Sequence, residues 1–475
     1  MLFNSVAFLL LLAAVLALHA SPLSWPARKV VLLVAGCVFY SAWNPAFLGL
    51  LAISAVTDWF VAGRIARAES PRERKAYLGL SLATNLGLLA TFKYGNFLAV
   101  NFELLAAWLG HPVALPRITL PLPVGISFYT FEALAYSVDV YRRRAVPWTR
   151  FTDFGVFLTF FPHLVAGPII RPADFRPQLE TERRTTREGL AWGLALLTWG
   201  LFQKVVLADG LLAPTVDAVF DSAARPGTLE AWAGALAFSG QIFFDFAGYT
   251  HCALGAALAL GFKLPDNFDS PYGAIGLGDF WRRWHVSLSS WLRDYLYIPL
   301  GGNRGSAANT VRNLMITMVL GGLWHGAAWT FIAWGALHGV LLVAERGARA
   351  AWARFSLPAP GRTLGATLAV ATFIAVTVAW VFFRAPDFAT AFRLLSAMAG
   401  GATSAARTIG ANWQRTLAFA LPLGLVVIHQ RFRAKPIQAG IDSWPAPVRA
   451  LALGAIIAAL VLFSNDDRAF IYFRF

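Results

Sequence analysis

Long apolar stretches recur from one end of this chain to the other, and they restrict its possible folds more than any other feature. Segments of about 20 apolar residues are long enough for a helix to cross the hydrocarbon core of a bilayer. Of the 475 residues, 57% are hydrophobic and only 14% are charged, and the mean hydropathy is +0.58. A soluble protein carries about a quarter charged residues. Because backbone groups in lipid need internal partners, the sequence predicts an all-α, polytopic membrane protein.

The predicted spans follow one another without an intervening soluble domain. They are approximately residues 1–20, 29–43, 46–63, 76–98, 118–140, 151–170, 188–208, 229–246, 247–262, 311–327, 328–345, 363–383, 412–430 and 447–464. The longest polar stretches, around 171–187 and 263–279, are short enough to be loops, so we expect one membrane domain over residues 1–475. No Lys or Arg precedes the first apolar run, so we expect that segment to be retained rather than cleaved as a signal peptide.

The net charge of +15 arises from 40 Lys and Arg against 25 Asp and Glu. The basic residues cluster between apolar segments, as at 28–29, 64–75 and 142–144. The positive-inside rule explains such clusters as contacts with membrane lipids, without nucleic acid, and favours a cytoplasmic first loop. Cys37 and Cys252 lie in apolar segments without a metal-binding pattern, so we expect free thiols.

One polar segment, DFWRRWHVSLSSWLRDYLYIPLGGNR, begins at Asp279 and ends at Arg304. Its periodicity predicts a helix that starts with Asp279 as the N-cap and ends before the glycine-rich GGNRG. The apolar stripe of this helix comprises Trp281, Trp284, His285, Leu288, Leu292 and Tyr295, and the opposite face carries Arg282, Ser289 and Arg293. Asp279 and Arg283 form a possible i,i+4 pair. The simplest interpretation is an amphipathic anchor at the membrane interface. An imidazole on a tryptophan-flanked apolar stripe favours a functional role, because polar groups there need partners.

A second unusual segment, LGGLWHGAAWTFIAWGALHG, covers residues 320–339. His325 lies inside a predicted span and is bracketed by glycines, which permit close helix approach. An ionisable residue within the membrane is a candidate functional residue, and the alternative is a packed core histidine. His338, on another face of the same segment, is expected to have a structural role.

The motifs that are absent narrow the chemistry. The chain has no GxSxG, HExxH, Cys/His or Walker A pattern, so a serine hydrolase, a metal enzyme and an ATP-driven pump are unsupported. A neutral imidazole can take a proton from a hydroxyl and return it to a leaving group. The residues therefore indicate an acid/base site within the membrane, and they specify no substrate.

The segments FPHLVAGPIIRP, QIFFDFAGY, GFKLPDNFDSPY, DFWRRWH, LGGLWHG and the terminal FIYFRF resemble the membrane-bound O-acyltransferase family in sequence and order. The likeness is to its bacterial alginate O-acetyltransferase-like branch and covers nearly the whole chain. The resemblance implies a ring of tilted spans with re-entrant or interfacial helices around a central pore, with a catalytic core at about residues 120–345. It also implies that His325 is the catalytic histidine and that His285 is the second polar residue of the site.

The resemblance implies an O-acetyltransferase of the bacterial inner membrane that has no tightly bound cofactor. It would pass an acetyl group from a cytoplasmic donor, acetyl-CoA, to an exopolysaccharide such as alginate, directly or through a periplasmic SGNH-type acetyltransferase. Candidate substrate- and donor-binding residues are Asp279, Trp281, Arg282, Arg283, Trp284, Asn303, Arg304 and Trp324. Of these, Arg282, Arg283 and Arg304 could hold donor phosphates, and lipid headgroups are the alternative.

One departure from the family pattern is Thr250-His251-Cys252, where many relatives carry Ser-Asp-Met. His251 is either a pore-lining group or a packed neighbour of Tyr249. Two other function classes remain open at this stage: a transporter of protons or acyl carriers, and a scaffold of a polysaccharide-secretion complex. The scaffold predicts tolerance to substitution of His285 and His325. A transporter would be expected to show paired halves, and the two polar segments are adjacent instead.

Overall fold

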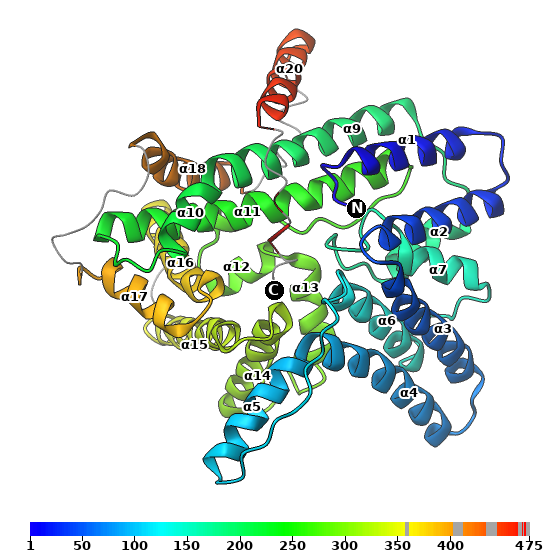
Figure 1. Ribbon diagram of the computed structural model, residues 1–475, viewed down its shortest axis with the longest axis horizontal. Helices are drawn as coiled ribbons and strands as arrows, with labels where there is room; N and C mark the ends of the chain where they lie inside the picture. The colour runs from blue at the N-terminus through cyan, green and yellow to red at the C-terminus, as the bar shows by residue number, and fades with distance from the viewer. Residues whose placement is uncertain (357–360, 402–411, 434–443, 464–467, 469, 472–475) are drawn as a thin grey trace. The chain divides into compact units, whose positions relative to one another are not determined.

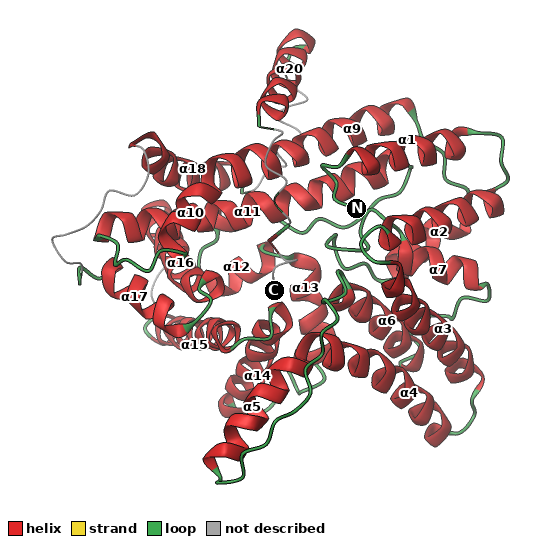
Figure 2. Cartoon of the chain, in the orientation of Figure 1, coloured by secondary structure: helices red, strands yellow, loops and turns green. Residues whose placement is uncertain are grey.

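The computed structural model describes residues 1–356, 361–401, 412–433, 444–463, 468 and 470–471. Helices joined by loops account for this part of the chain, and no strand occurs in it (Figure 2). The only extended pairing among these residues is an isolated antiparallel bridge between Phe268 and Trp284. The prediction of an all-α protein is confirmed.

The chain forms two compact units. The first comprises Met1–Leu197 and Cys252–Pro265, and the second comprises Thr198–His251 and Asp266–Phe475. The chain crosses between the units three times: within α9 (Arg187–Leu201), within α11 (Thr228–Ala259) and in the loop between Pro265 and Asp266.

The first unit is a set of helices, several of which begin at a capping side chain or a proline. In order they are α1 (Val6–Ala20), α2 (Trp25–Ser41), α3 (Pro45–Arg67), α4 (Pro71–Leu89), the π-helical turn η1 (Ala90–Tyr94), α5 (Gly95–Trp108), α6 (Ile126–Tyr141), α7 (Phe151–Thr159), α8 (Pro172–Glu180) and most of α9 (Figure 1). The side chain of Asn44 accepts a hydrogen bond from the backbone N–H of Ala46, 3.0 Å away, and Pro45 occupies the first turn. Such a cap supplies an acceptor for a helix-end N–H, and proline is pre-shaped for this position.

The second unit holds both histidine segments. Its elements are the π-helical η2 (Phe202–Leu212), α10 (Ala213–Phe220), α11, the 3-10 turn η3 (Pro271–Gly273), α12 (Leu277–Arg283), α13 (Val286–Leu292), the π-helical η4 (Arg293–Tyr297), α14 (Ala307–His325), α15 (Trp329–Arg354), α16 (Arg362–Arg384), α17 (Phe388–Met398), α18 (Asn412–Arg431) and α20 (Ala446–Leu462). Ser306 caps α14 by accepting a hydrogen bond from the N–H of Asn309.

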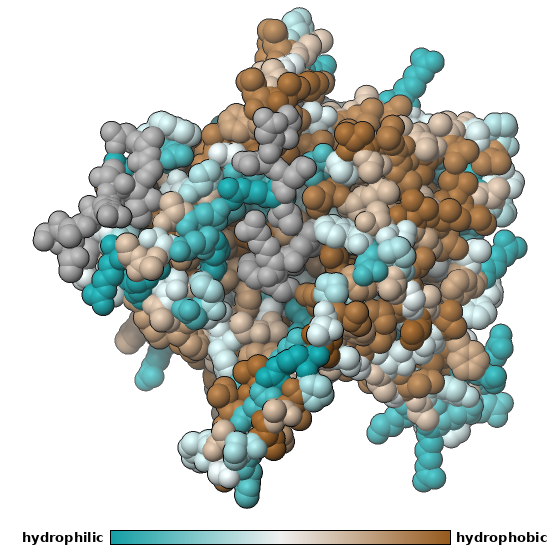
Figure 3. Space-filling model, viewed as in Figure 1, coloured by the Kyte–Doolittle hydropathy of each residue, from teal (hydrophilic) through white to brown (hydrophobic). Residues whose placement is uncertain are grey.

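Four helices in the described residues are long and apolar enough to cross a membrane: Pro45–Arg67, Arg187–Phe220, Thr228–Ala259 and Thr363–Arg384. Shorter apolar helices include α1 and α20. Apolar side chains of α20 such as Leu451 and Val461 are exposed, and this helix is largely brown at the top of Figure 3. Exposed leucine and valine on an isolated helix face are what a lipid-contacting surface requires. The protein is an all-α polytopic membrane protein.

Several predicted boundaries are wrong. The spans at 229–246 and 247–262 form one helix, α11 (Thr228–Ala259), and no proline interrupts that apolar run. Helix α7 ends at Thr159, although the predicted span extended to residue 170, and α6 begins only at Ile126. The amphipathic helix α17 was not predicted. Residue 464, at the end of the last predicted span, lies outside the described residues, as do residues 472–475 of the terminal motif.

Helices α14 and α15 pack closely through glycines, and this contact positions His325 at the end of α14. A Cβ atom on Gly322 would lie 2.3 Å from the carbonyl oxygen of Phe331, and one on Gly335 would lie 2.3 Å from that of Met318. Only glycine allows backbones to approach so closely, as in other small-residue helix contacts. Gly322, three residues before His325, and Gly335 therefore serve the helix crossing.

Candidate functional site

His285 lies at a sharp break in the backbone. It has φ 44° and ψ 55°, the left-handed region, and it separates α12 from α13. The break is held from outside by the extended segment 267–269: the N–H of Asp269 donates to the carbonyl of Arg283, and the N–H of Val286 donates to the carbonyl of Asn267, both at 3.0 Å. The predicted continuous helix from Asp279 to Tyr295 is therefore wrong. This pairing competes with helical hydrogen bonds and interrupts them at His285.

The imidazole of His285 is fully buried, and its Nδ1 lies 3.3 Å from Oδ1 of Asn267. The same oxygen accepts a 2.6 Å hydrogen bond from the hydroxyl of Ser287 and a longer one from the backbone N–H of Ser287. Because a backbone N–H can only donate, this atom of Asn267 is the acceptor, and His285 Nδ1 carries the proton. Burial lowers the pKa of His285, so the ring is neutral and Nε2 carries the lone pair.

His325 is the last residue of α14 and is almost completely buried. Three aromatic rings contact its imidazole at centroid distances of 5.0–5.3 Å: Trp324, Trp334 and Phe383. All three contacts are edge-to-face, with interplanar angles of 69–88°. Such packing excludes water and holds the imidazole in one orientation.

The structure brings His285 and His325 into ring contact with the same tryptophan, Trp324. The ring of Trp324 lies 6.0 Å from that of His285 and 5.0 Å from that of His325. The ring of Phe246 of α11 lies 4.6 Å from that of His285. Two buried imidazoles from separate segments thus contact the same indole ring, which makes them candidates for an acid/base pair.

An aromatic cluster continues from His325 through Trp334. The ring of Trp334 lies 4.8 Å from His338 and 5.7 Å from Trp281, and it stacks on Trp380. Trp281 is thus close to the site. The ring of Trp284 packs in the core instead, against Phe268, Tyr272, Phe280 and Trp380.

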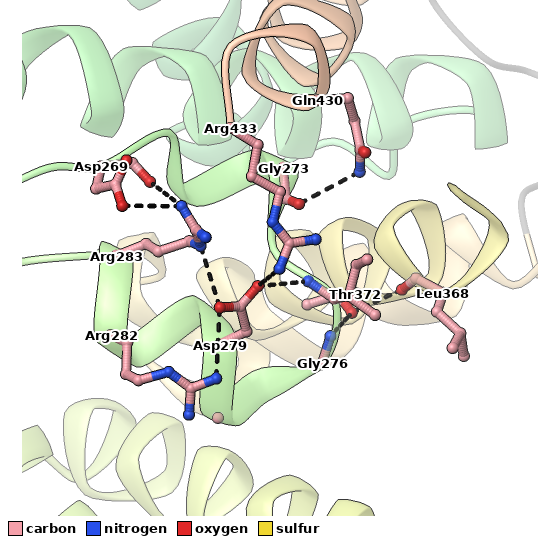
Figure 4. Close-up of polar contacts among 12 residues, drawn as sticks. Asp269, Gly273, Gly276, Asp279, Arg282, Arg283, Leu368, Thr372, Gln430 and Arg433 are labelled. Carbon is pink, nitrogen blue, oxygen red and sulfur yellow. Dashed lines mark hydrogen bonds and ion pairs between the residues drawn. The ribbon is translucent and has the colours of Figure 1, made fainter. Parts of the chain in front are cut away.

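Asp279 is the centre of an ionic cluster at the start of α12 (Figure 4). Its carboxylate accepts a 3.0 Å hydrogen bond from the N–H of Ile275, pairs with Arg283 at 3.1 Å and with Arg282 at 3.4 Å, and pairs with Arg433 beyond the end of α18. The expected i,i+4 pair is present. Gly276, however, is the N-cap of α12, and Asp279 lies in the first turn.

The charge of Asp279 is set by opposing effects. Burial raises the pKa of Asp279, but the hydrogen bond from Ile275 and the positive charges of Arg283 and Arg433 outweigh it, so the pKa is lowered. Arg283 is further committed to Asp269, at 2.9 Å. Most of the side chain of Arg282 is exposed, at 68%. Arg282 is therefore the arginine of this cluster that remains accessible.

The segment that leads into α12 and carries Asp279, residues 272–279, is held by three other helices. The N–H of Gly276 donates to Thr372 of α16 at 2.8 Å, and the N–H of Gly278 donates to Glu345 of α15 at 2.8 Å. From α18, Gln430 donates to the carbonyl of Gly273, and Nδ1 of His429 accepts from Tyr272. Figure 4 shows Gln430 and Arg433 approaching this loop from above. We call Asp279, its arginines and these tethers the Asp279 clasp.

Asn303 and Arg304 lie in the loop before α14 and are exposed. The Oδ1 atom of Asn303 accepts hydrogen bonds from Tyr297, at 2.5 Å, and from Arg346, at 3.3 Å. No described contact joins either residue to the two histidines. They belong to the surface around this segment, and their predicted role in substrate binding stays a prediction.

Two residues of the site were not predicted. Asn267 entered the sequence analysis only as part of the GFKLPDNFDSPY segment, and its distance along the chain from His285 gives no sign of a contact. Arg433 comes from the other end of the second unit.

His251, for which the sequence left two roles open, has its Nδ1 2.6 Å from Oε1 of Gln203. No group of three or more metal-ligating side chains occurs in the described part of the chain.

Comparison with known proteins shows similarity over most of the chain. Residues 121–385 match the membrane-bound O-acyltransferase family. A protein of Azotobacter vinelandii named "Probable alginate O-acetylase" is 42% identical, covering 84% of this chain and 78% of that protein. A peptidoglycan O-acetyltransferase of Helicobacter pylori is 38% identical, over 78% of this chain and 74% of that protein. A teichoic acid D-alanyltransferase of Streptococcus thermophilus is 31% identical, over 46% and 56% respectively.

Proposed function

Because this chain belongs to the membrane-bound O-acyltransferase family and is an O-acyltransferase, we propose that it transfers acetyl groups from acetyl-CoA to hydroxyls of a glycan. The names of the relatives support acetyl as the transferred group, because two of the three are named for O-acetylation and the less similar one for D-alanylation. The acceptor is an alginate-like exopolysaccharide, reached across the bacterial inner membrane either directly or through a periplasmic SGNH-type acetyltransferase.

One observation carries the proposal: two buried imidazoles from separate segments contact the same tryptophan, Trp324. His325 acts as the general base. It takes the proton from the attacking hydroxyl, whose oxygen forms a bond to the acetyl carbonyl carbon. The carbon–sulfur bond of the thioester then breaks, and His325 returns the proton to the departing thiolate.

His285 orients the hydroxyl in this mechanism. Its hydrogen bond to Asn267 places the proton on Nδ1, so Nε2 carries the lone pair and can accept from a neighbouring hydroxyl of the glycan, while the attacking hydroxyl gives its own proton to His325. The lowered pKa of His285 argues against a protonated ring that stabilises negative charge. The exposed guanidinium of Arg282 supports a contact with the donor phosphates, whereas the two carboxylates that bind Arg283 make it unsuited to that task.

The test is His325→Ala in the purified protein, reconstituted in vesicles with labelled acetyl-CoA, together with the acetyl content of the cell's glycans. Transfer is expected to fall at least about 100-fold, which is the lower end for loss of a general base. His19→Gln is the matched control. His19 is an equally buried histidine in the first unit, whose ring contacts are Trp25 and Phe262.

The outcomes separate the function classes. Undiminished transfer by a folded His325→Ala protein would exclude the mechanism. No consumption of acetyl-CoA by the unaltered protein would favour a transporter or a scaffold. If cells with His325→Ala lose acetyl groups from peptidoglycan alone, the acceptor is peptidoglycan and not an exopolysaccharide.

A further inference from the structure

Three rings near His325 carry four buried nitrogens that have no hydrogen-bond partner within the described residues. They are Nε1 of Trp281, Nε1 of Trp334 and both ring nitrogens of His338. The three rings contact one another: His338 lies 4.8 Å from Trp334 and 5.2 Å from Trp281, and the two indoles are 5.7 Å apart. His338 is fully buried.

This arrangement is costly for a structural core. Each buried polar group without a partner lowers stability, and a phenylalanine in the place of His338 would avoid that loss. Native proteins satisfy nearly all such groups, so a cluster of three calls for an explanation. Destabilising features of this kind are retained where they serve function.

The chemistry of the three groups identifies the missing partner. An indole nitrogen can only donate, and a neutral imidazole contributes one further donor. The second ring nitrogen of His338 carries a lone pair, so the cluster offers three N–H donors and one acceptor, and a carbonyl oxygen is the atom of an acyl group that can accept from these donors. Trp334 is also in ring contact with His325, at 5.1 Å, so an oxygen bound to the indole N–H lies within one ring of the catalytic imidazole.

Building on the proposed function, we propose that Trp334, His338 and Trp281 bind the carbonyl oxygen of the acyl group during its transfer. When the hydroxyl oxygen attacks the carbonyl carbon, the carbonyl electron pair moves onto this oxygen, and His325 receives the hydroxyl proton. The three N–H groups stabilise the resulting negative charge. Collapse re-forms the C=O bond, breaks the carbon–sulfur bond and sends the proton to the thiolate. Donors aimed at developing charge in a dry site are a main source of rate acceleration.

The experiment compares Trp334→Phe, His338→Phe and Trp281→Phe in reconstituted vesicles with acetyl-CoA. Each change keeps a ring and removes a donor. We expect kcat to fall about 100-fold or more for Trp334→Phe and His338→Phe, with a much smaller change in KM, because the contact strengthens as charge develops. Thermal stability is expected to stay the same or to rise. The double variant should lose less than the product of the single losses, since both groups bind one oxygen.

Two controls distinguish this role from packing. Trp232→Phe removes an indole N–H that does have an acceptor, the carbonyl of Met398 at 3.1 Å, so it should lower stability and keep kcat. His338→Gln retains a side-chain N–H and should recover part of the kcat lost in His338→Phe.

The proposal is overturned if the phenylalanine variants of Trp334 and His338 keep kcat, as they would if the three rings bound only a buried water. It is also overturned if kcat falls only in step with stability. Failure of the proposed function would be seen earlier, as the absence of acetyl transfer by the unaltered protein.

Discussion

His285 combines a backbone task with a chemical one. Its left-handed conformation ends α12 and starts α13, and its imidazole meets Asn267 on one side and Trp324 on another. The left-handed region costs most L-residues about 1–2 kcal/mol and is disfavoured most for β-branched ones. Substitutions can therefore separate the two tasks.

His285→Asn is expected to keep the fold and to lose activity, because asparagine tolerates the left-handed region but lacks an imidazole. His285→Val is expected to unfold at lower temperature, since it adds a strained backbone of about 1–2 kcal/mol to the loss of the ring. Thermal unfolding in detergent and acetyl transfer in vesicles give the two readouts. Equal stability of the two variants would contradict the backbone role.

Asn267 is expected to be a positioning residue for His285. Asn267→Ala removes the acceptor shared by Ser287 and His285, leaving buried donors unsatisfied at about 1–3 kcal/mol. Without this acceptor, the proton of the His285 ring can lie on either nitrogen. We therefore expect kcat to fall and the pH profile of kcat to shift. Ser290→Ala, which removes a local hydrogen bond to the carbonyl of Ser287, is the control that should change neither.

At the scale of elements, the α14–α15 crossing and the Asp279 clasp hold the two histidine segments. Helical periodicity correctly indicated that residues 279–295 carry a buried aromatic stripe, since Trp284 and Leu288 are buried. It could not reveal the break at His285, because that break depends on hydrogen bonds to residues 267–269. Local patterns report which face is apolar, and they do not report pairing with a distant segment.

Gly322→Val should displace His325 by forcing α14 away from α15. Its Cβ would collide with the carbonyl oxygen of Phe331, and overpacking of this kind costs about 1–3 kcal/mol. Both stability and activity should fall. Gly347→Ala in α15 is the matched control, because nothing lies within 4 Å of its added Cβ, and alanine there should raise stability by up to about 1 kcal/mol. Full activity of Gly322→Val would show that the close crossing is dispensable.

The Asp279 clasp should weaken in acid. Since the pKa of Asp279 is lowered in the folded protein, its contribution to stability is complete above the ordinary aspartate pKa of about 3.9 and disappears as the pH falls through the folded value. Unfolding temperature measured from neutral pH down to about pH 3 should therefore drop more steeply for the unaltered protein than for Asp279→Asn. Glu180→Gln, at an exposed carboxylate, should leave the slope unchanged. Parallel curves for Asp279→Asn and the unaltered protein would count against the clasp.

At the scale of the whole molecule, the second unit contains a buried charge cluster of Lys204, Asp209 and Asp245. Lys204 Nζ lies 3.0 Å from Asp209 and also pairs with Asp245, which in turn accepts the backbone N–H of Ile471 at 2.8 Å. Three segments that are far apart in the sequence therefore meet at one ionic centre. None of these contacts could be inferred from sequence, because each residue is an isolated charge within an apolar run.

Lys204→Met should lower the yield of folded protein in the membrane more than any histidine substitution. It leaves two buried carboxylates without their cation, which costs about 3–5 kcal/mol. Lys204→Arg, which keeps the charge, should be milder. Yield and detergent melting temperature are the measurements, and a Lys204→Met protein of ordinary stability would contradict the structural role of the cluster.

The fold class, the family and both histidine segments could be predicted because they depend on composition and on short local motifs. The roles of Asn267 and Arg433, and the clustering of Trp281, Trp334 and His338, could not be predicted. They depend on neighbours that only the fold brings together.

The stacked indoles of Trp334 and Trp380, 5.4 Å apart with planes only 16° from parallel, have an optical consequence. The electronic transitions of two indoles held this close couple to each other. The pair should therefore add two bands of opposite sign to the ultraviolet circular dichroism spectrum. Because Trp334 also contacts His325, that feature reports whether the imidazole of His325 keeps its place in the cluster, in an unlabelled sample and without any substrate.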